Sequence, residues 1–273
     1  MFGRTLFLLS FLAGPVLADV QTVIEGHIEP GYTNLLATTT KLSTAATADC
    51  SPDAVRPHFH VAYDAWISIS HIQFGPIEDQ GLSLAMAFWP DPKDSTGKAI
   101  ATGLETKADK ILMDWPAFVS LMTSAGEPGN ARFQSGDEVN RALYTALSTG
   151  LEFLHDQRLG RPLGTFERPR PRRAEARRSE RSLRHIVLSL EALEALATIL
   201  SGGDLTKTKA AFAAAIDRAV ALEDPALTGV SNPGQRIRIE TLQRTVNDIR
   251  NAVNDEIGKS LDITAGFNSL DGD

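Results

Sequence analysis

Apolar residues recur every three or four positions along most of the chain, which is the period of an amphipathic α-helix. The clearest run lies between Ser135 and Gly160 and forms one apolar stripe, which must face a core. Its members are Val139, Leu143, Leu147, Leu151 and Leu154. Ser135 is a good N-cap residue, and Glu138 three positions later predicts a capping box. Gly160 and Pro162 predict the end of this helix.

Gly150 lies in the middle of the predicted helix, where glycine costs about 1 kcal/mol relative to alanine. A glycine in this position predicts that another element packs close to the helix backbone. Glu152 follows two positions later, and His155 lies on the same helix face as Glu152. This Glu-x-x-His spacing occurs in helical di-iron bundles, so the segment is a candidate metal site.

The same period predicts further helices, bounded by proline or glycine. Ser51-Pro52 is a strong start signal for a helix whose core face includes Trp66. We expect Pro30-Gly31 to break a helix, Trp115-Pro116 to open one and Asn232-Pro233 to start the last. The expected ranges are 20–28, 32–46, 51 to about 74, 78–88, 95–108, 183–200, 204–222 and 232–257. Since no alternating run is long enough for a strand, we predict an all-α protein built of helical bundles.

Arginine is concentrated between Arg158 and Arg184, where ten residues are arginine and none is lysine. Prolines lie among the first of them, so residues 161–175 are expected to link an N-terminal bundle, 19–160, to a C-terminal bundle, 176–273. The second half of the run is expected to be the polar start of a long helix. Two interpretations stay open: a solvated connector, or an anion-binding surface for acidic partners or phosphate head groups.

Residues 1–18 are typical of a secretory signal peptide. Arg4 supplies the positive charge, residues 6–17 the short apolar stretch, and Ala18 the small residue at the cleavage site. We therefore expect an exported protein of the periplasm or cell envelope. The apolar stretch is too short to span a membrane, and no longer one follows, so the mature protein is expected to lack a membrane span.

The formal net charge of −7 argues against a nucleic-acid partner, which requires a basic face. Cys50 is the single cysteine and so excludes an internal disulfide. We expect it to be a small buried residue.

Four segments in order resemble the imelysin family, a group of exported bacterial proteins. These are Cys50 through Ala65-Trp66 to Phe74-Gly75-Pro76, then Thr149 to Leu154, Arg177-Arg178 leading into Leu183 to Ile186, and Gly266 to Asp273. The resemblance implies two helical halves with a site where they meet. It also implies either a metallopeptidase, through a Gly-x-His-x-x-Glu motif, or metal binding without hydrolysis, as in periplasmic iron-uptake relatives.

This chain departs from that motif. Aligned on Glu152, the motif histidine falls on Thr149 and the motif glycine on Leu147, so only the glutamate is retained. A threonine hydroxyl is a poor ligand for zinc or iron, which weakens the peptidase interpretation. His71, which follows the Trp66 helix, is the other histidine expected near the site.

Three hypotheses follow. The first is a binding or accessory protein of iron or other metal uptake, with iron or zinc at the metal-site residues and a small ligand or an envelope protein as partner. The second is a metal-independent module that binds a protein or an acidic ligand in the groove between the halves, and the third is a metallopeptidase. The candidate metal residues are Glu152, His155 and His71, and the candidate ligand-binding residues are Trp66, Gly75, Pro76, Thr149 and Gly150. We assign no catalytic residue.

Overall fold

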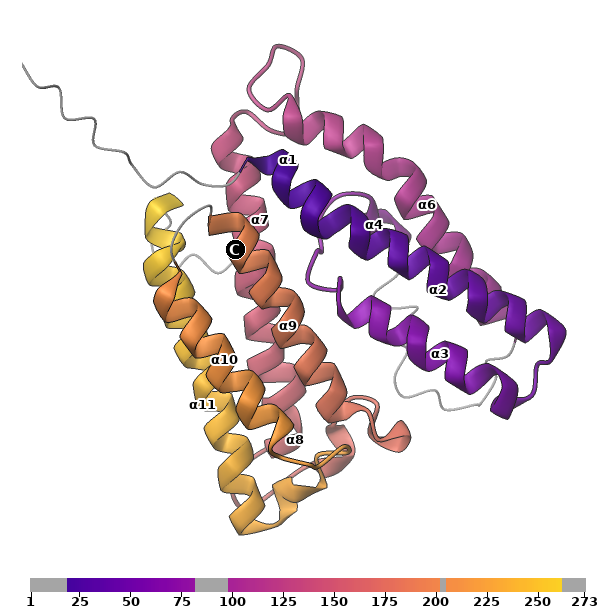
Figure 1. Cartoon of the computed structure of the whole chain (residues 1–273), viewed down its shortest axis with the longest axis vertical. Coiled ribbons are helices and arrows are strands. Elements are labelled where there is room, and N and C mark those ends of the chain that lie inside the picture. The colour runs from indigo at the N-terminus through magenta and orange to yellow at the C-terminus, as the bar shows by residue number, and fades with distance from the viewer. Residues whose placement is uncertain (1–18, 82–97, 202–204, 262–273) are drawn as a thin grey trace, which may run out of the picture.

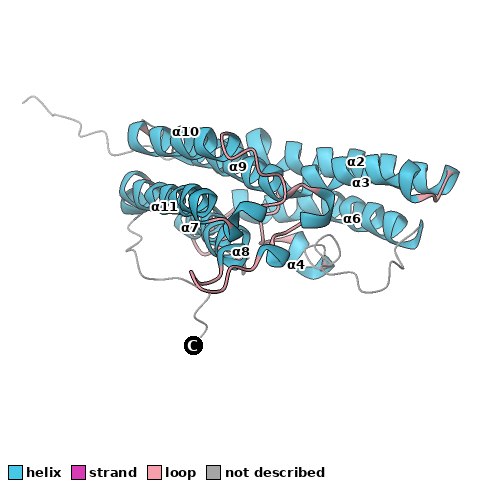
Figure 2. Cartoon of the chain, turned by 90° about the horizontal axis from the view of Figure 1, so that it is seen from below, coloured by secondary structure: helices cyan, strands magenta, loops and turns pink. Residues whose placement is uncertain are grey.

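The structure is a computed structural model of the whole chain, which describes residues 19–81, 98–201 and 205–261. Every regular element within these ranges is a helix, which confirms the predicted all-α class. Figure 1 shows two groups of helices that meet at an angle, and Figure 2 shows an upper and a lower layer in each group. The predicted signal peptide, most of the expected helix 78–88 and the C-terminal segment of the resemblance lie outside the described residues.

The first group surrounds the long helix α2. Its elements are α1 (Val20–Val23), η1 (Ile24–Ile28), α2 (Glu29–Ala48), α3 (Pro52–Ile67), α4 (Pro76–Gln80) and α6 (Lys98–Thr123). Helix α2 packs against both α3 and α6, and α4 packs against α6. Tyr32 and Trp115 join α2 to α6 with ring centroids 5.3 Å apart, and both are fully buried.

The second group holds the remaining helices. Its main elements are α7 (Gly136–Phe153), η2 (Leu154–Gly160), α8 (Arg161–Leu163), α9 (Ser182–Ser201), α10 (Thr206–Val220) and α11 (Pro233–Glu256). Short 3₁₀ turns are η3 (Pro171–Arg173), η4 (Arg177–Ser179), η5 (Thr228–Ser231) and η6 (Gly258–Leu261). Helix α10 packs against α9 and α11, and α7 packs against the same two helices. The expected division after residue 160 stays a prediction, and the contacts place α7 with the later helices.

Three prolines that were expected to bound helices do not do so. Pro30 lies in the first turn of α2, which continues from a π-helical segment, η1. Pro116 lies inside α6, because the expected helix 95–108 and the helix expected to open at Trp115 form one helix that buries Trp115. Pro162 lies in α8, which continues from η2 without a break, and Gly164 with φ +58° ends the helix.

The predicted N-caps had different outcomes. Ser51 accepts from Ala54 N, and Asn232 accepts from Gly234 N and Gln235 N, which confirms both caps. Ser135 makes no side-chain capping bond, and Glu138 accepts from Gln134 N at 2.7 Å in place of closing the predicted box.

The close approach predicted at Gly150 is confirmed. Leu193 of α9 and His71 pack against the α7 backbone at this glycine, with no room between for a side chain.

The expectation for Cys50 was wrong, since the residue is exposed in the turn between α2 and α3. Among the described residues, no helix combines the length and the apolar character that crossing a bilayer requires.

Candidate anion-binding pocket

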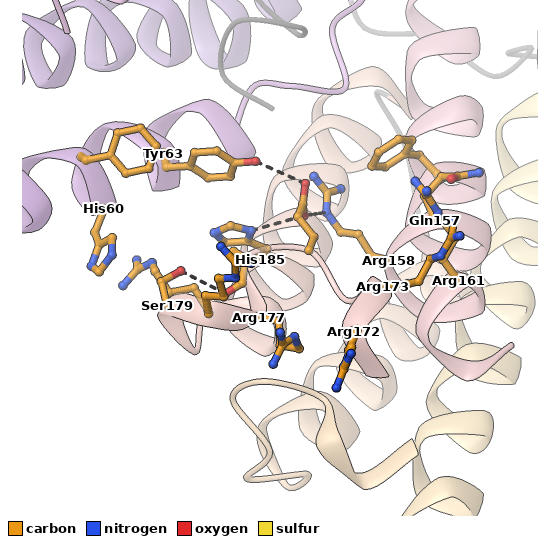
Figure 3. Close-up of a pocket in the computed structure, with 16 residues that line it drawn as sticks. His60, Tyr63, Gln157, Arg158, Arg161, Arg172, Arg173, Arg177, Ser179 and His185 are labelled. Carbon is orange, nitrogen blue, oxygen red and sulfur yellow. Dashed lines mark hydrogen bonds and ion pairs between the residues drawn. The ribbon is translucent and has the colours of Figure 1, made fainter. Parts of the chain in front are cut away.

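A pocket of about 670 Å³ lies between α3 of the first group and the arginine-rich segment of the second. Figure 3 shows His60 and Tyr63 entering it from α3, with Arg158 and Arg161 on the opposite side. Its volume lies in the usual range for a site that holds an organic small molecule. Because the walls come from both groups of helices, the pocket lies where the groups meet.

Arginine dominates the lining of this pocket. Seven arginine side chains line it, at positions 158, 161, 172, 173, 177, 178 and 181, against a single carboxylate, Glu175. The expected helix start is absent here, because α9 begins only at Ser182 and Arg177 lies in the 3₁₀ turn η4. The short turns η3 and η4 therefore present their arginines to the pocket.

Glu175 is already neutralised by its neighbours. Its Oε2 accepts from Arg158 Nε at 2.8 Å and lies 3.3 Å from His185 Nδ1. Burial alone would raise the pKa of Glu175, but the charge of Arg158 and the hydrogen bonds lower it to about 2. The carboxylate is thus ionised, and it offers no free negative charge to the other arginines.

His185 is held between Glu175 and Tyr63. The Tyr63 ring stacks on it with centroids 4.7 Å apart, and the Tyr63 hydroxyl donates to Glu175 Oε1 at 3.4 Å. Burial lowers the pKa of His185 below its ordinary value, so the ring is neutral near pH 7. Since Nδ1 donates to the carboxylate, Nε2 carries the lone pair.

Asp64 fixes the arginine segment to α3. It pairs with Arg181, and its Oδ2 accepts from Arg184 Nε at 2.7 Å.

Three buried nitrogen atoms of the lining have no hydrogen-bond partner among the described residues: His185 Nε2, Arg177 Nε and Arg181 Nε. Buried polar atoms are almost always satisfied, so orphan nitrogens in a pocket wall indicate a polar occupant.

The predicted metal residues have separate partners. Glu152 Oε2 lies 4.0 Å from Arg250 of α11, and His155 Nδ1 lies 2.6 Å from Asp156 Oδ1. Within the described ranges, no three His, Cys, Asp or Glu side chains are grouped so as to hold a metal ion. The metal site therefore stays a prediction that this arrangement does not favour.

His71, the third predicted metal residue, forms a pair with His27. Their Nε2 atoms lie 2.8 Å apart, beside Gly150. Burial lowers the pKa of His27 to about 4 and that of His71 well below its ordinary value. One neutral ring donates to the other, and the pair joins η1 to the turn after α3.

The predicted ligand-binding residues all have structural surroundings. Trp66 is buried in the core, and Pro76 is the buried first residue of α4. Gly75 has φ +80° and faces Phe118, so it forms a turn that packs against α6. Thr149 Oγ1 donates to Thr145 O at 2.8 Å. None of these residues, nor Gly150, lines the pocket.

Sequence reasoning came close to the site without selecting it. The α3 residues of the pocket lie one or two turns before Trp66, and Phe153 follows Glu152 directly. Arg177-Arg178 and His185 belong to one of the segments that carry the resemblance. The sequence feature that pointed to the pocket was the concentration of arginine between Arg158 and Arg184. It left an anion-binding surface as one of two interpretations.

Fold and site together define an all-α protein of two helical groups with a cationic pocket at their junction. The family model described as Imelysin (Peptidase_M75) matches residues 28–114 and 95–253. The chain therefore belongs to the imelysin family, as the sequence resemblance indicated.

The solved structures include one similar fold. The crystal structure of an imelysin-like protein from Psychrobacter arcticus 273-4 matches with a TM-score of 0.69 and 17% sequence identity. The match covers 92% of this chain and 100% of that one. At this identity the likeness shows the fold alone. No curated protein matches the chain.

Proposed function

We propose that this imelysin-family protein is a binding protein whose pocket holds a small anionic ligand. The observation that carries the proposal is the unbalanced charge of the lining. Within the described residues, four of the arginines have neither an ion pair nor a hydrogen bond from their side chains: Arg161, Arg172, Arg173 and Arg177. Planar guanidinium groups bind carboxylate and phosphate oxygens in a bidentate manner.

The rest of the chain makes this cluster distinctive. The protein carries a net charge of −7, so a local excess of arginine concentrates anions at one place on an otherwise acidic molecule. The buried Nε–H donors of Arg177 and Arg181, which have no hydrogen-bond partner among the described residues, support the same conclusion. We propose no catalytic step.

The proposal is tested by calorimetric titration of the purified protein with citrate, phosphate and sulfate at constant ionic strength. The double variant Arg173→Gln/Arg177→Gln is expected to bind at least tenfold more weakly than the wild type. The matched control is Arg168→Gln, which removes an exposed arginine of the same segment that does not line the pocket. Equal affinities in the wild type and the double variant would contradict the proposal.

The predicted role in metal uptake stays part of the proposal in a narrower form. An arginine-lined pocket repels a bare Fe³⁺ or Zn²⁺ ion but attracts a metal held by an anionic chelator. Tighter binding of ferric citrate than of citrate would support this form. Saturable binding of free iron or zinc that is lost in Glu152→Gln would instead support the site at Glu152, His155 and His71.

We also propose that the protein is exported to the periplasm or cell envelope and meets an envelope protein there. This proposal is supported by the pattern of residues 1–18 and by the family. Fractionation of cells that express the full chain tests it, and cytoplasmic accumulation of uncleaved protein would contradict it.

A further inference from the structure

We infer that the ligand is an amphiphilic anion, with an acidic group at the arginines and an aromatic or other planar apolar body against the opposite wall. The inference rests on the proposed function and names the class of its ligand. It follows from the composition of the two walls and from the size of the space between them.

One wall is aromatic. Phe59 and Tyr63 of α3 form this wall, with ring centroids 5.7 Å apart. Phe153 at the end of α7 lines the pocket on the side of Arg158. Phe153 is 47% exposed, although it is large and apolar. Exposed aromatic side chains in a concave site offer surface that a bound apolar group removes from water.

The other wall is cationic and comes from the turns η3 and η4. Arg172, Arg173 and Arg177 line it without ion pairs to other described residues. Arg158 lies on the side of the pocket opposite α3: its guanidinium is 4.8 Å from the Phe153 ring centroid, while its Nε donates to Glu175. Since the charge of Arg158 is already paired, the acidic group of a ligand is directed to η3 and η4.

The pocket volume is larger than an acidic group alone requires. A space of about 670 Å³ is much larger than a phosphate, sulfate or acetate ion, which would leave Phe59 and Phe153 in water. A planar body fills this space, because it can stack on the phenylalanine rings and on guanidinium planes.

The test compares 2-naphthoate with acetate and with uncharged 2-naphthylmethanol in calorimetric titrations. We expect 2-naphthoate to bind at least tenfold more tightly than acetate or phosphate, and the alcohol to show no saturable binding. Phe153→Ala is expected to lower the affinity for 2-naphthoate about tenfold, and that for citrate much less. The control is Phe166→Ala, because Phe166 is 73% exposed and lies outside the pocket lining.

The outcomes separate this inference from the proposed function. Equal affinity for acetate and 2-naphthoate, with loss of both in Arg173→Gln/Arg177→Gln, would overturn the amphiphilic ligand and leave the anion pocket standing. Tightest binding of citrate, with no effect of Phe153→Ala on 2-naphthoate, would do the same. No binding of any anion would overturn both. A circular-dichroism melt of each variant verifies that it is folded.

Discussion

Gly150 of α7 and Leu193 of α9 approach so closely that a Cβ atom on Gly150 would lie 2.6 Å from Leu193 Cδ2. The same atom would lie 3.0 Å from His71 Cβ, so a larger residue here would displace its neighbours where three segments meet. It joins α7 and α9 to the turn that follows α3, and so it lies at the junction of the two helical groups.

Replacing Gly150 by alanine is therefore expected to destabilise the fold. Alanine gains about 1 kcal/mol of helix propensity, but overpacking of a buried contact costs about 1–3 kcal/mol. We expect a net loss of about 1 kcal/mol in the free energy of unfolding, measured by urea denaturation. The matched control is Gly103→Ala in α6, where a Cβ meets nothing within 4 Å. That variant is expected to be as stable as the wild type or more stable, and a stabilised Gly150→Ala would contradict the argument.

The part-buried pair His27–His71 predicts a pH dependence of stability. The pKa of His27 is about 4 in the folded protein and near 6.5 in the unfolded chain, so the unfolded state binds more protons between these values. The contribution of His27 to the free energy of unfolding is therefore fully present above pH 6.5. It falls as the pH drops towards 4, by an amount on the order of 3 kcal/mol. His71, whose pKa is also lowered, adds to the loss.

Urea denaturation at pH 7 and pH 5 measures this effect. His27→Gln is expected to reduce the stability difference between the two pH values. The control is His58→Gln, which removes an exposed histidine of α3 and is expected to leave the difference unchanged. An unchanged difference in His27→Gln would show that the pair does not control the pH dependence.

Glu175→Gln is expected to have opposite effects on stability and on anion binding. Removing the charge that neutralises the buried Arg158 destabilises the protein, by about 2 kcal/mol in the absence of anions. The variant leaves Arg158 without a carboxylate, so citrate is expected to raise its thermal stability more than that of the wild type. Asp255→Asn, which removes an exposed pair with Lys259, is the control for losing a carboxylate. An equal response to citrate in Glu175→Gln and the wild type would contradict the prediction.

The N-caps offer a direct comparison of two helix starts. Asn232 Oδ1 accepts from Gly234 N at 3.0 Å and from Gln235 N at 3.2 Å. Asn232→Ala is therefore expected to lower the free energy of unfolding by about 1 kcal/mol. Ser135→Ala, at a start where no side-chain capping bond is made, is expected to change it by less than about 0.5 kcal/mol. Similar losses in the two variants would contradict this difference.

The sequence predicted the helical class because a stripe such as Val139 to Leu154 depends only on local spacing. It misjudged Pro30 and Pro116, since proline predicts a local break, whereas burial of Tyr32 and Trp115 between α2 and α6 favours continuous helices. Tertiary packing, which no local pattern records, decided these boundaries.

The candidate site was predicted less well than the fold. The close packing at Gly150 was predicted from the helix-propensity cost of a glycine inside a helix. Glu152 and His155, in contrast, were chosen by their spacing on a single helix. The pocket instead combines Tyr63, Glu175 and His185, which are distant in sequence and which one chain without related sequences does not reveal as neighbours.

Helix α1 continues into α2 through η1, yet it packs against α9, which begins only at Ser182. During synthesis, the first helical residues of the chain must therefore wait for a late segment to emerge from the ribosome before their final contacts can form. Until then the segment that holds Val23 and Ile24, both fully buried in the finished fold, lacks its contacts with α9.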